Sequence, residues 1–400
     1  MTIAAIRKAL TALTLALAPI LVDPGHAQVP TISLQTLPSA AVRPAIDGIF
    51  DAFETHSLVG LSDKHGLAQE IEFYEALIRD PRFSDSVRNV VVEFGGASRQ
   101  DVIDRYVDGE AVPYRLLRQV WTDTVGWLPT VQYVGYAHFL DQVRLVNATL
   151  PPDKHIRIWL GEPPVDWATI KTSDDYAAFL RVYPSRDRHA AQVIVREVLA
   201  RKEKALVLYG GQHFGRLSAE ERNLRARWVE ADAANAQPAI LTLQGLVELD
   251  YPDAFFIIQV YDGLNDETCT SRFETNISSW PMPALATPVR GTTLEREMRE
   301  CPPQANIRFI FPPTMPQALR DLRRAEANDV LFRGDAVLFL GPAISLTRSP
   351  LFPDLYLDAE YRQEIERVVK IRMGQPPPPD WGRDPQLVQL PFRLSPARRR

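Results

Sequence analysis

The chain has 400 residues, of which 46% are hydrophobic and 24% are charged, and its formal net charge is −5. This composition is typical of a folded globular protein, and it argues against a nucleic-acid partner because no basic excess exists to follow the phosphates. A chain of this length is expected to form one large α/β domain or two smaller ones.

The N-terminus has the layout of a bacterial Sec-type signal peptide. Arg7 and Lys8 form a basic start, residues 9–22 are apolar, and Gly25 and Ala27 are the small residues that a signal peptidase requires. The apolar stretch is about 14 residues long, shorter than the roughly 18 to 20 of a membrane span. We expect residues 1–27 to be removed, leaving a periplasmic or secreted protein without a membrane span. A membrane-anchoring helix is the alternative.

Residues 57–66, with the sequence SLVGLSDKHG, are the stretch around which the chain is organised. The apolar run at residues 58–61 predicts a buried strand, and the apolar spacing over residues 66–78 predicts a helix. In open α/β sheets, the loop after the carboxyl end of a strand opens into the crevice where ligands bind. Asp63 and His65 are therefore candidate site residues.

A second buried strand is predicted by the β-branched residues 90–92, and Glu93 follows them directly. A carboxylate in this position is a metal ligand, a general acid or base, or a structural acceptor for backbone amides. Gly95 and Gly96 permit a close approach of other backbone, so a functional role for Glu93 is favoured.

Residues 99–147 are predicted to be a helical insertion rich in aromatic side chains. The segment either packs into the core or lines the site as a lid, and its helical spacing favours the core. His138, which lies among these aromatics, is interpreted as a structural histidine. The aromatic residues are Trp121, Trp127, Tyr133, Tyr136 and Phe139.

A further strand is predicted at residues 156–160, and it ends in the loop GEPPVDW. The two prolines of this loop prevent regular structure from continuing. Glu162 and Asp166 therefore lie on a rigid loop at another strand end, and they are secondary candidates for the site.

An amphipathic helix is predicted at residues 190–201, directly after the sequence SRDRH. Asp187 either caps this helix or holds Arg186 or His189 toward the crevice. Asp187 and Arg186 are secondary candidates for the site.

The strand predicted at residues 205–209 runs into GGQHFG and places His213 at its end. The pattern of a strand followed by Gly, two residues and His is repeated at residues 62–65 with Ser in place of Gly. The repetition suggests two related half-sheets that meet across one cleft.

Five motifs, SDKHG, VVVEFGG, GEPPVDW, SRDRHAA and LYGGQHFG, occur in this order within residues 57–215. Together they resemble the erythromycin esterase/ChaN/Tiki-TraB superfamily, in particular its exported bacterial members. The resemblance implies an α/β fold with a central, mostly parallel sheet flanked by helices and with an active-site cleft at the strand carboxyl ends. It implies that His65 activates water with the help of Glu93, as in the esterase branch. In the Tiki branch, related residues, including the one matched by His213, act with a divalent metal in peptide cleavage, whereas ChaN is associated with haem.

The first motif departs from the superfamily pattern, because Ser62 and Asp63 stand where Gly and Glu are usual. Aspartate is one methylene shorter than glutamate, so a water or metal held there would move by about 1.5 Å, while reacting groups need placement within roughly 0.5 Å. A catalytically inactive relic of the fold is a further alternative.

The remaining chain is predicted to complete a single domain that spans residues 40–372, followed by a disordered tail rich in Pro and Arg at residues 373–400. Cys269 and Cys301 are the only cysteines. In an oxidising compartment an isolated pair favours a disulfide over a metal site, and the bridge is worth roughly 3 to 4 kcal/mol by the chain-entropy estimate. Further strands are predicted at residues 239–245, 254–260, 307–311 and 336–340, and helices at residues 294–300 and 317–328.

These observations lead to the hypothesis of an exported hydrolase that acts on an ester or peptide bond of a small-molecule or peptide substrate. His65 would take a proton from water, Glu93 would orient His65 or share a cation with it, and His213 would polarise or protonate the departing group. The set Asp63, His65, Glu93 and His213 would also suit Mn, Co or Zn, and metal-free and metal-dependent versions both stay open. The alternative is a non-catalytic protein that binds haem or another large planar ligand against residues 121–139.

Overall fold

The computed structural model describes residues 37–126, 133–183, 185–215, 242–264, 266–301, 334–374 and 376. In this part of the chain, eight strands form one sheet in the order β1-β7-β8-β6-β2-β5-β3-β4. The pairs β1–β7 and β7–β8 are antiparallel, and the other pairs are parallel. The strands are β1 Ala41–Pro44, β2 Leu58–Asp63, β3 Arg88–Gly96, β4 Arg157–Glu162, β5 Lys204–Gly210, β6 Phe255–Val260, β7 Ala284–Thr287 and β8 Ala336–Phe339. The predicted α/β fold with a mostly parallel central sheet is confirmed.

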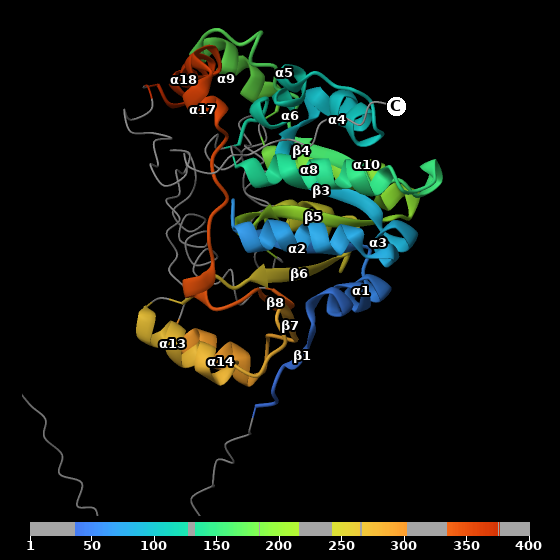
Figure 1. Ribbon diagram of the computed structural model, residues 1–400, viewed down its shortest axis with the longest axis vertical. Coiled ribbons are helices and arrows are strands. Elements are labelled where there is room, and N and C mark those ends of the chain that lie inside the picture. The colour runs from blue at the N-terminus through green and yellow to red at the C-terminus, as the bar shows by residue number, and fades with distance from the viewer. Residues whose placement is uncertain are drawn as a thin grey trace, which may run out of the picture. The chain divides into compact units, whose positions relative to one another are not determined.

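Helices cover both faces of the sheet, and Figure 1 shows α2 and α8 lying along one of them. Alternate residues of each strand point to opposite faces, so Val59 and Leu61 of β2 join the core under α2 and α8, while Leu58 joins the core under α10. Burial on both faces explains why the central strands read as uninterrupted apolar runs. The helices of the first face are α1 Ala45–Thr55, α2 Ala68–Arg79, α3 Pro81–Ser86, α4 Gln100–Val107 and α8 Val134–Asn147, and those of the second are α10 Arg186–Glu197 and α12 Leu243–Val247.

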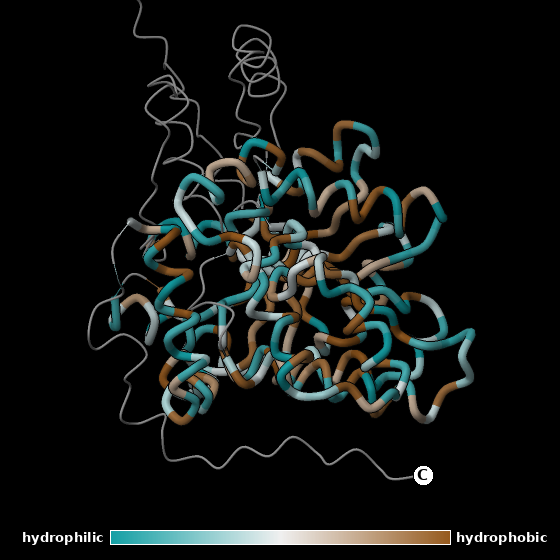
Figure 2. The backbone as a smooth tube through the Cα atoms, turned by 90° about the horizontal axis from the view of Figure 1, so that it is seen from above, coloured by the Kyte–Doolittle hydropathy of each residue, from teal (hydrophilic) through white to brown (hydrophobic). Residues whose placement is uncertain are grey.

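The remaining helices pack beside the sheet. α9 and α18 share a small apolar cluster with α17 and lie together in Figure 1, while α13 and α14 pack near β7 and β8. Figure 2 shows hydrophobic residues along many interior segments of the backbone and hydrophilic residues on many outer turns. All described elements belong to one compact unit that begins at Pro38. The bounds are α5 Tyr114–Leu117, α6 Gln119–Thr122, α9 Ser173–Val182, α13 Glu267–Asn276, α14 Thr293–Glu300, α17 Asp354–Leu357 and α18 Ala359–Met373.

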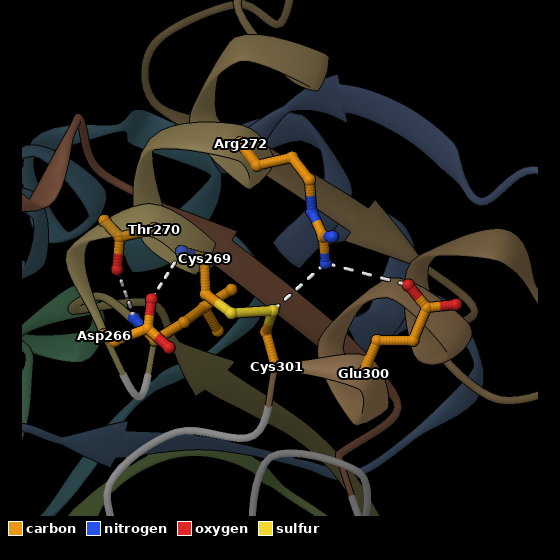
Figure 3. Close-up of a disulfide and its surroundings, with 7 residues drawn as sticks. Asp266, Cys269, Thr270, Arg272, Glu300 and Cys301 are labelled. Atoms are coloured by element: carbon orange, nitrogen blue, oxygen red, sulfur yellow. Dashed lines mark hydrogen bonds and ion pairs between the residues drawn. A yellow bond between two sulfur atoms is a disulfide. The ribbon is translucent and has the colours of Figure 1, made fainter.

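A disulfide joins Cys269 on α13 to Cys301 at the end of α14, as predicted (Figure 3). The two Cα atoms lie 5.7 Å apart. Arg272 donates to the Sγ atom of Cys301 at 3.0 Å and also approaches Glu300 at 3.7 Å. The bridge ties two helices of one apolar cluster together, away from the central strands.

Two of the predictions about the sheet are wrong. The strand expected at residues 239–245 is instead helical from Leu243, because the side chain of Thr242 accepts a hydrogen bond from the amide of Gly245 and caps α12. The expected half-sheets do not face each other across a cleft: β2 and β5 are hydrogen-bonded neighbours in one sheet. The segments predicted at residues 1–27, 307–311 and 317–328 lie outside the described residues. Of the disordered tail predicted at residues 373–400, Met373 is the last residue of α18, and residues 377–400 lie outside the described residues. Within the described residues, no helix combines the length and the apolar character that crossing a membrane requires.

Candidate functional site

Four neighbouring parallel strands, β2, β5, β3 and β4, bring their carboxyl ends to one edge of the sheet. β2 ends at Asp63, which is paired in register with Gly210 at the end of β5. Glu93 lies near the end of β3, and Glu162 ends β4. The sheet therefore gathers residues that are far apart in the chain at the edge where open α/β sheets bind ligands.

His65 is held by Asp63. The Nδ1 atom of His65 lies 2.6 Å from Oδ2 of Asp63, and the hydroxyl of Tyr136 donates to the same oxygen at 2.6 Å. The hydroxyl of Tyr74 donates to the other oxygen, Oδ1, at 3.0 Å. The Nε2 atom of His65 has no hydrogen-bond partner among the described residues, and the side chain is 29% exposed. With Nδ1 bonded to the carboxylate, Nε2 is the nitrogen that a substrate can reach.

Glu70 extends this network behind His65. Its carboxyl contacts the hydroxyl of Tyr74 and accepts a hydrogen bond from the amide of Lys64 at 2.9 Å. Burial, followed by the charge of Asp63, raises the pKa of Glu70 well above its ordinary value. The sequence analysis missed this residue, although its spacing from Tyr74 and Leu77 places it on the buried face of α2.

Glu93 is the centre of a second cluster. Its Oε1 atom accepts a hydrogen bond from Nη2 of Arg186 at 2.7 Å and lies 3.4 Å from Nε2 of His213. Its Oε2 atom accepts from the amide of Gly210 at 2.7 Å. Arg186 also donates through Nε to Glu162 at 2.6 Å, so one guanidinium joins two buried carboxylates. Glu93 therefore acts as a buried acceptor for both charged side chains and backbone.

His213 forms a second histidine–carboxylate pair. Its Nδ1 atom lies 2.5 Å from Oδ1 of Asp187, whose other oxygen accepts from the amide of Leu243 at 3.0 Å. Its Nε2 atom is buried and makes no hydrogen bond. Oε1 of Glu93 lies 3.4 Å away, which is close enough for an ion pair but too far for a good hydrogen bond. His213 thus lies behind the surface that a substrate could touch.

The charges of this edge shift each other's pKa values. Burial alone would raise the pKa of Glu93, but the charges of His213, His65 and Arg186 hold it well below its ordinary value. Burial by itself would lower the pKa of His213, yet the negative charges of Asp187 and Glu93 raise it to about 10. Burial would also lower the pKa of His65. The effect of Glu93 and Asp63 is larger than that of burial, so the pKa of this histidine is raised. At neutral pH, His213 is an imidazolium.

Gly210 brings the two clusters together. A Cβ atom on this residue would lie 3.0 Å from Nε2 of His65 and 3.4 Å from Oε2 of Glu93. The ring of His65 and the carboxylate of Glu93 therefore approach the same point of the β5 backbone, where no other residue type fits without displacing them.

The secondary candidates divide in two. Glu162, Arg186 and Asp187 join the cluster around Glu93. Asp166 does not, because it accepts from the amide of Ala168 at 3.0 Å and lies 3.5 Å from Arg99.

The suggestion that Asp187 caps the following helix is wrong. Ser185 caps α10, and its side chain accepts a hydrogen bond from the amide of Arg188. Asp187, in the first turn, is left to bind His213 and Leu243.

The donor set at this edge does not fit a metal ion. Both oxygens of Asp63 accept hydrogen bonds from Tyr74, Tyr136 or His65, and both oxygens of Glu93 accept from Arg186 or Gly210. Within the described ranges, no group of three or more His, Cys, Asp or Glu side chains is arranged to hold a metal. A divalent cation would have to displace hydrogen bonds to a guanidinium, so no step of the chemistry is assigned to it.

The aromatic segment does not form an open wall for haem. Trp121, Tyr136 and Phe139 are at most 1% exposed, with Trp121 stacked on Phe352 and Phe94 stacked on Tyr136. These side chains are part of the core, and Tyr136 reaches the site only through its hydroxyl. Trp127 lies outside the described residues.

The free energy of unfolding is expected to fall as the pH rises through the alkaline range, because of His213. Its folded-state pKa of about 10 is above the ordinary value of 6.5, so its stabilising contribution is complete below pH 6.5 and is lost as the pH rises toward 10. The expected slope is about −1 kcal/mol per pH unit.

Urea unfolding between pH 7 and 9 measures this slope. His213→Gln should flatten it, whereas His155→Gln, which removes an imidazole paired with Asp108 elsewhere, should leave it unchanged. An equal slope in all three proteins would contradict the assignment.

Comparisons with known proteins give structural likeness only. No family model and no curated protein matches the chain. Among solved structures, the chain is similar to a protein from Bacillus cereus, with a TM-score of 0.45 and 13% identity over 80% of this chain and 96% of that one. It is also similar to the type III effector HopBA1, with a TM-score of 0.32 and 16% identity over 57% and 93% of the two chains. A third similar structure describes cofacial heme binding to ChaN of Campylobacter jejuni, with a TM-score of 0.31 and 12% identity over 55% and 87%.

Proposed function

We propose that the protein is an exported, metal-independent hydrolase of ester or peptide bonds, in the superfamily that its five motifs resemble. One observation carries the proposal: His65 is fixed through Nδ1 by Asp63, while its Nε2 atom is left for a substrate beside Arg186 and Glu93. A histidine oriented by a buried carboxylate is the arrangement that general acid–base catalysis requires.

In the proposed reaction, Nε2 of His65 takes a proton from a water molecule as its oxygen attacks the carbonyl carbon of the substrate. The carbonyl oxygen becomes negatively charged and is stabilised by one N–H group of Arg186 that is bonded to neither Glu93 nor Glu162. The carbon–oxygen or carbon–nitrogen bond then breaks, and His65 returns its proton to the departing alcohol or amine. The products are a carboxylic acid and that alcohol or amine.

The buried residues hold this arrangement in place. The imidazolium of His213 keeps Glu93 ionised, and Glu93 in turn raises the pKa of His65. This role replaces the expectation that His213 protonates the departing group, since the Nε2 atom of His213 is buried. Tyr74 and Tyr136 support Asp63 from behind.

Export is part of the proposal. It is supported by the signal-type sequence at residues 1–27 and by the disulfide between Cys269 and Cys301, which is typical of oxidising compartments. N-terminal sequencing of the protein recovered from the periplasm or the medium, expected to begin at Gln28, checks this part.

The activity is tested with a panel of chromogenic esters and fluorogenic peptides, with and without EDTA. We expect turnover that EDTA does not reduce. kcat/KM should rise with pH through a pKa above 6.5, where His65 loses its proton, and fall again near pH 10, where His213 does. Loss of all turnover with EDTA, restored by added Zn or Mn, would overturn the metal-independent mechanism.

A further inference from the structure

A second arginine approaches the guanidinium of Arg186. Arg372, on the last turn of α18, donates through Nη1 to the carbonyl oxygen of Gly126. A Cβ atom on Gly126 would lie 2.9 Å from Nη2 of Arg186. The two guanidinium groups therefore lie next to the same glycine, although their residues lie far apart in the sequence.

Arg372 forms no ion pair with a carboxylate within the part of the chain that the structure describes. Its neighbours are the carbonyl of Gly126, the phenol of Tyr176 and the cation of Arg186, while Glu162, which binds Arg186, acts on it only through its charge. Burial lowers the pKa of Arg372, and the charge of Arg186 acts in the same direction. A largely buried cation next to another cation is costly unless an anion compensates it.

Arg367, on the same helix, is an arginine whose guanidinium has both carbonyl and carboxylate partners within the protein. It donates to the carbonyl oxygens of Ile170 at 2.6 Å and Trp167 at 2.7 Å, and it also pairs with Glu364 at 2.6 Å. Arg372 has the contact to a backbone carbonyl but lacks the carboxylate. The difference leaves Arg372 without a carboxylate partner among the described residues, and an anion bound from solution would supply one.

Arg186 has donors left for such an anion. Its Nε and Nη2 atoms bind Glu162 and Glu93, and its Nη1 atom has no acceptor among the described residues. The Arg186 side chain is 27% exposed, so solvent reaches it. Planar guanidinium groups bind carboxylate and phosphate oxygens through pairs of N–H bonds.

We propose that Arg372 and Arg186 form a binding subsite for an oxyanion, and that substrates of this protein carry a carboxylate or phosphate group beside the bond that is cleaved. This substrate class rests on the proposed hydrolase function, whereas the oxyanion subsite itself does not. Arg372 determines specificity by holding the anionic group, and it takes no part in the proton transfers of His65.

The subsite is tested by thermal unfolding of the full protein in rising concentrations of inorganic phosphate and, separately, of acetate. NaCl is adjusted to keep the ionic strength constant. We expect a saturable rise of Tm with at least one of the two anions. A comparison of the two titrations shows whether the subsite recognises phosphate or carboxylate. Arg372→Gln should weaken the binding by about tenfold or more. The control Lys370→Gln removes one positive charge from an exposed position of the same helix and should leave the binding unchanged.

The same variant separates a ligand-binding role from a structural one. Without added anion, Arg372→Gln should unfold at the same temperature as the unsubstituted protein or above it, because an uncompensated charge has been removed. A lower Tm without anion, together with phosphate and acetate effects equal to those in the unsubstituted protein, would overturn the proposal. So would the absence of any saturable effect of either anion.

The two proposals fail in different experiments. If the ester and peptide panel is not hydrolysed while an anion still binds through Arg372, the hydrolase function is wrong and the oxyanion subsite stands. If hydrolysis is found, anionic substrates should have the higher kcat/KM, and Arg372→Gln should remove that preference through KM. Hydrolysis with no such preference would refute the substrate class.

Discussion

Replacing His65 with glutamine is expected to lower kcat/KM for the best ester or peptide substrate by about 10³-fold, within the range that a positioned general acid–base group contributes. Glutamine has an amide that can donate to Asp63, the partner of His65 Nδ1, but it cannot take a proton from water at neutral pH. In this variant, kcat/KM should no longer rise with pH above 6.5, since that rise reflects the loss of the proton from His65. Steady-state kinetics from pH 5 to 10 measures both effects.

The matched control is His155→Gln. His155 also pairs with an aspartate, Asp108 at 3.0 Å, but this pair lies away from the edge where the strands end. The variant should keep full activity and an unchanged pH profile. Equal activities of the His65→Gln variant and the unsubstituted protein would show that His65 is not the base.

Replacing Glu93 with glutamine is expected to reduce the free energy of unfolding by about 3 kcal/mol, because buried Arg186 and His213 each lose a carboxylate partner. The same change should lower the pKa of His65, whose raised value depends on the charge of Glu93. The acidic limb of the activity profile should then move to lower pH. Urea denaturation measures the first effect, and the pH dependence of kcat/KM measures the second.

Glu110→Gln provides the comparison with a surface ion pair. Glu110 pairs with Arg105 at 2.8 Å and is 57% exposed, so water already screens the interaction. Its unfolding curve should coincide with that of the unsubstituted protein. If Glu93→Gln is equally stable, the buried cluster does not depend on the Glu93 charge.

The sequence predicted the central strands well because their signal is local. Continuous apolar runs mark β2, β3 and β5, and a polar residue follows each run, although β3 continues beyond Glu93 to Gly96. The order of residues along the chain was therefore enough to place Asp63, His65, Glu93 and His213 at strand ends. β1 and β7 were not predicted, whereas β8, which also has four residues, was.

The role of each site residue depended on contacts that spacing does not show. Asp187 reads equally as a helix cap, and only the position of His213 reveals that it binds an imidazole. The burial of the Nε2 atom of His213 could not be read from the sequence, and it supports the proposed role behind the site in place of proton donation to the departing group. Tyr136 reads as a core aromatic and is one, yet its hydroxyl also supports Asp63.

The sequence by itself determined the layered α/β fold and the polar residues that end its central strands, because hydrophobic periodicity depends only on neighbouring residues. The tertiary structure decided that β2, β5, β3 and β4 lie side by side, and hence that His65 and Glu93 meet at Gly210. It also placed Arg372 and Arg186 next to the same residue, Gly126. Such pairings join residues far apart in the chain, and the order of strands in a sheet is set by packing over the whole domain.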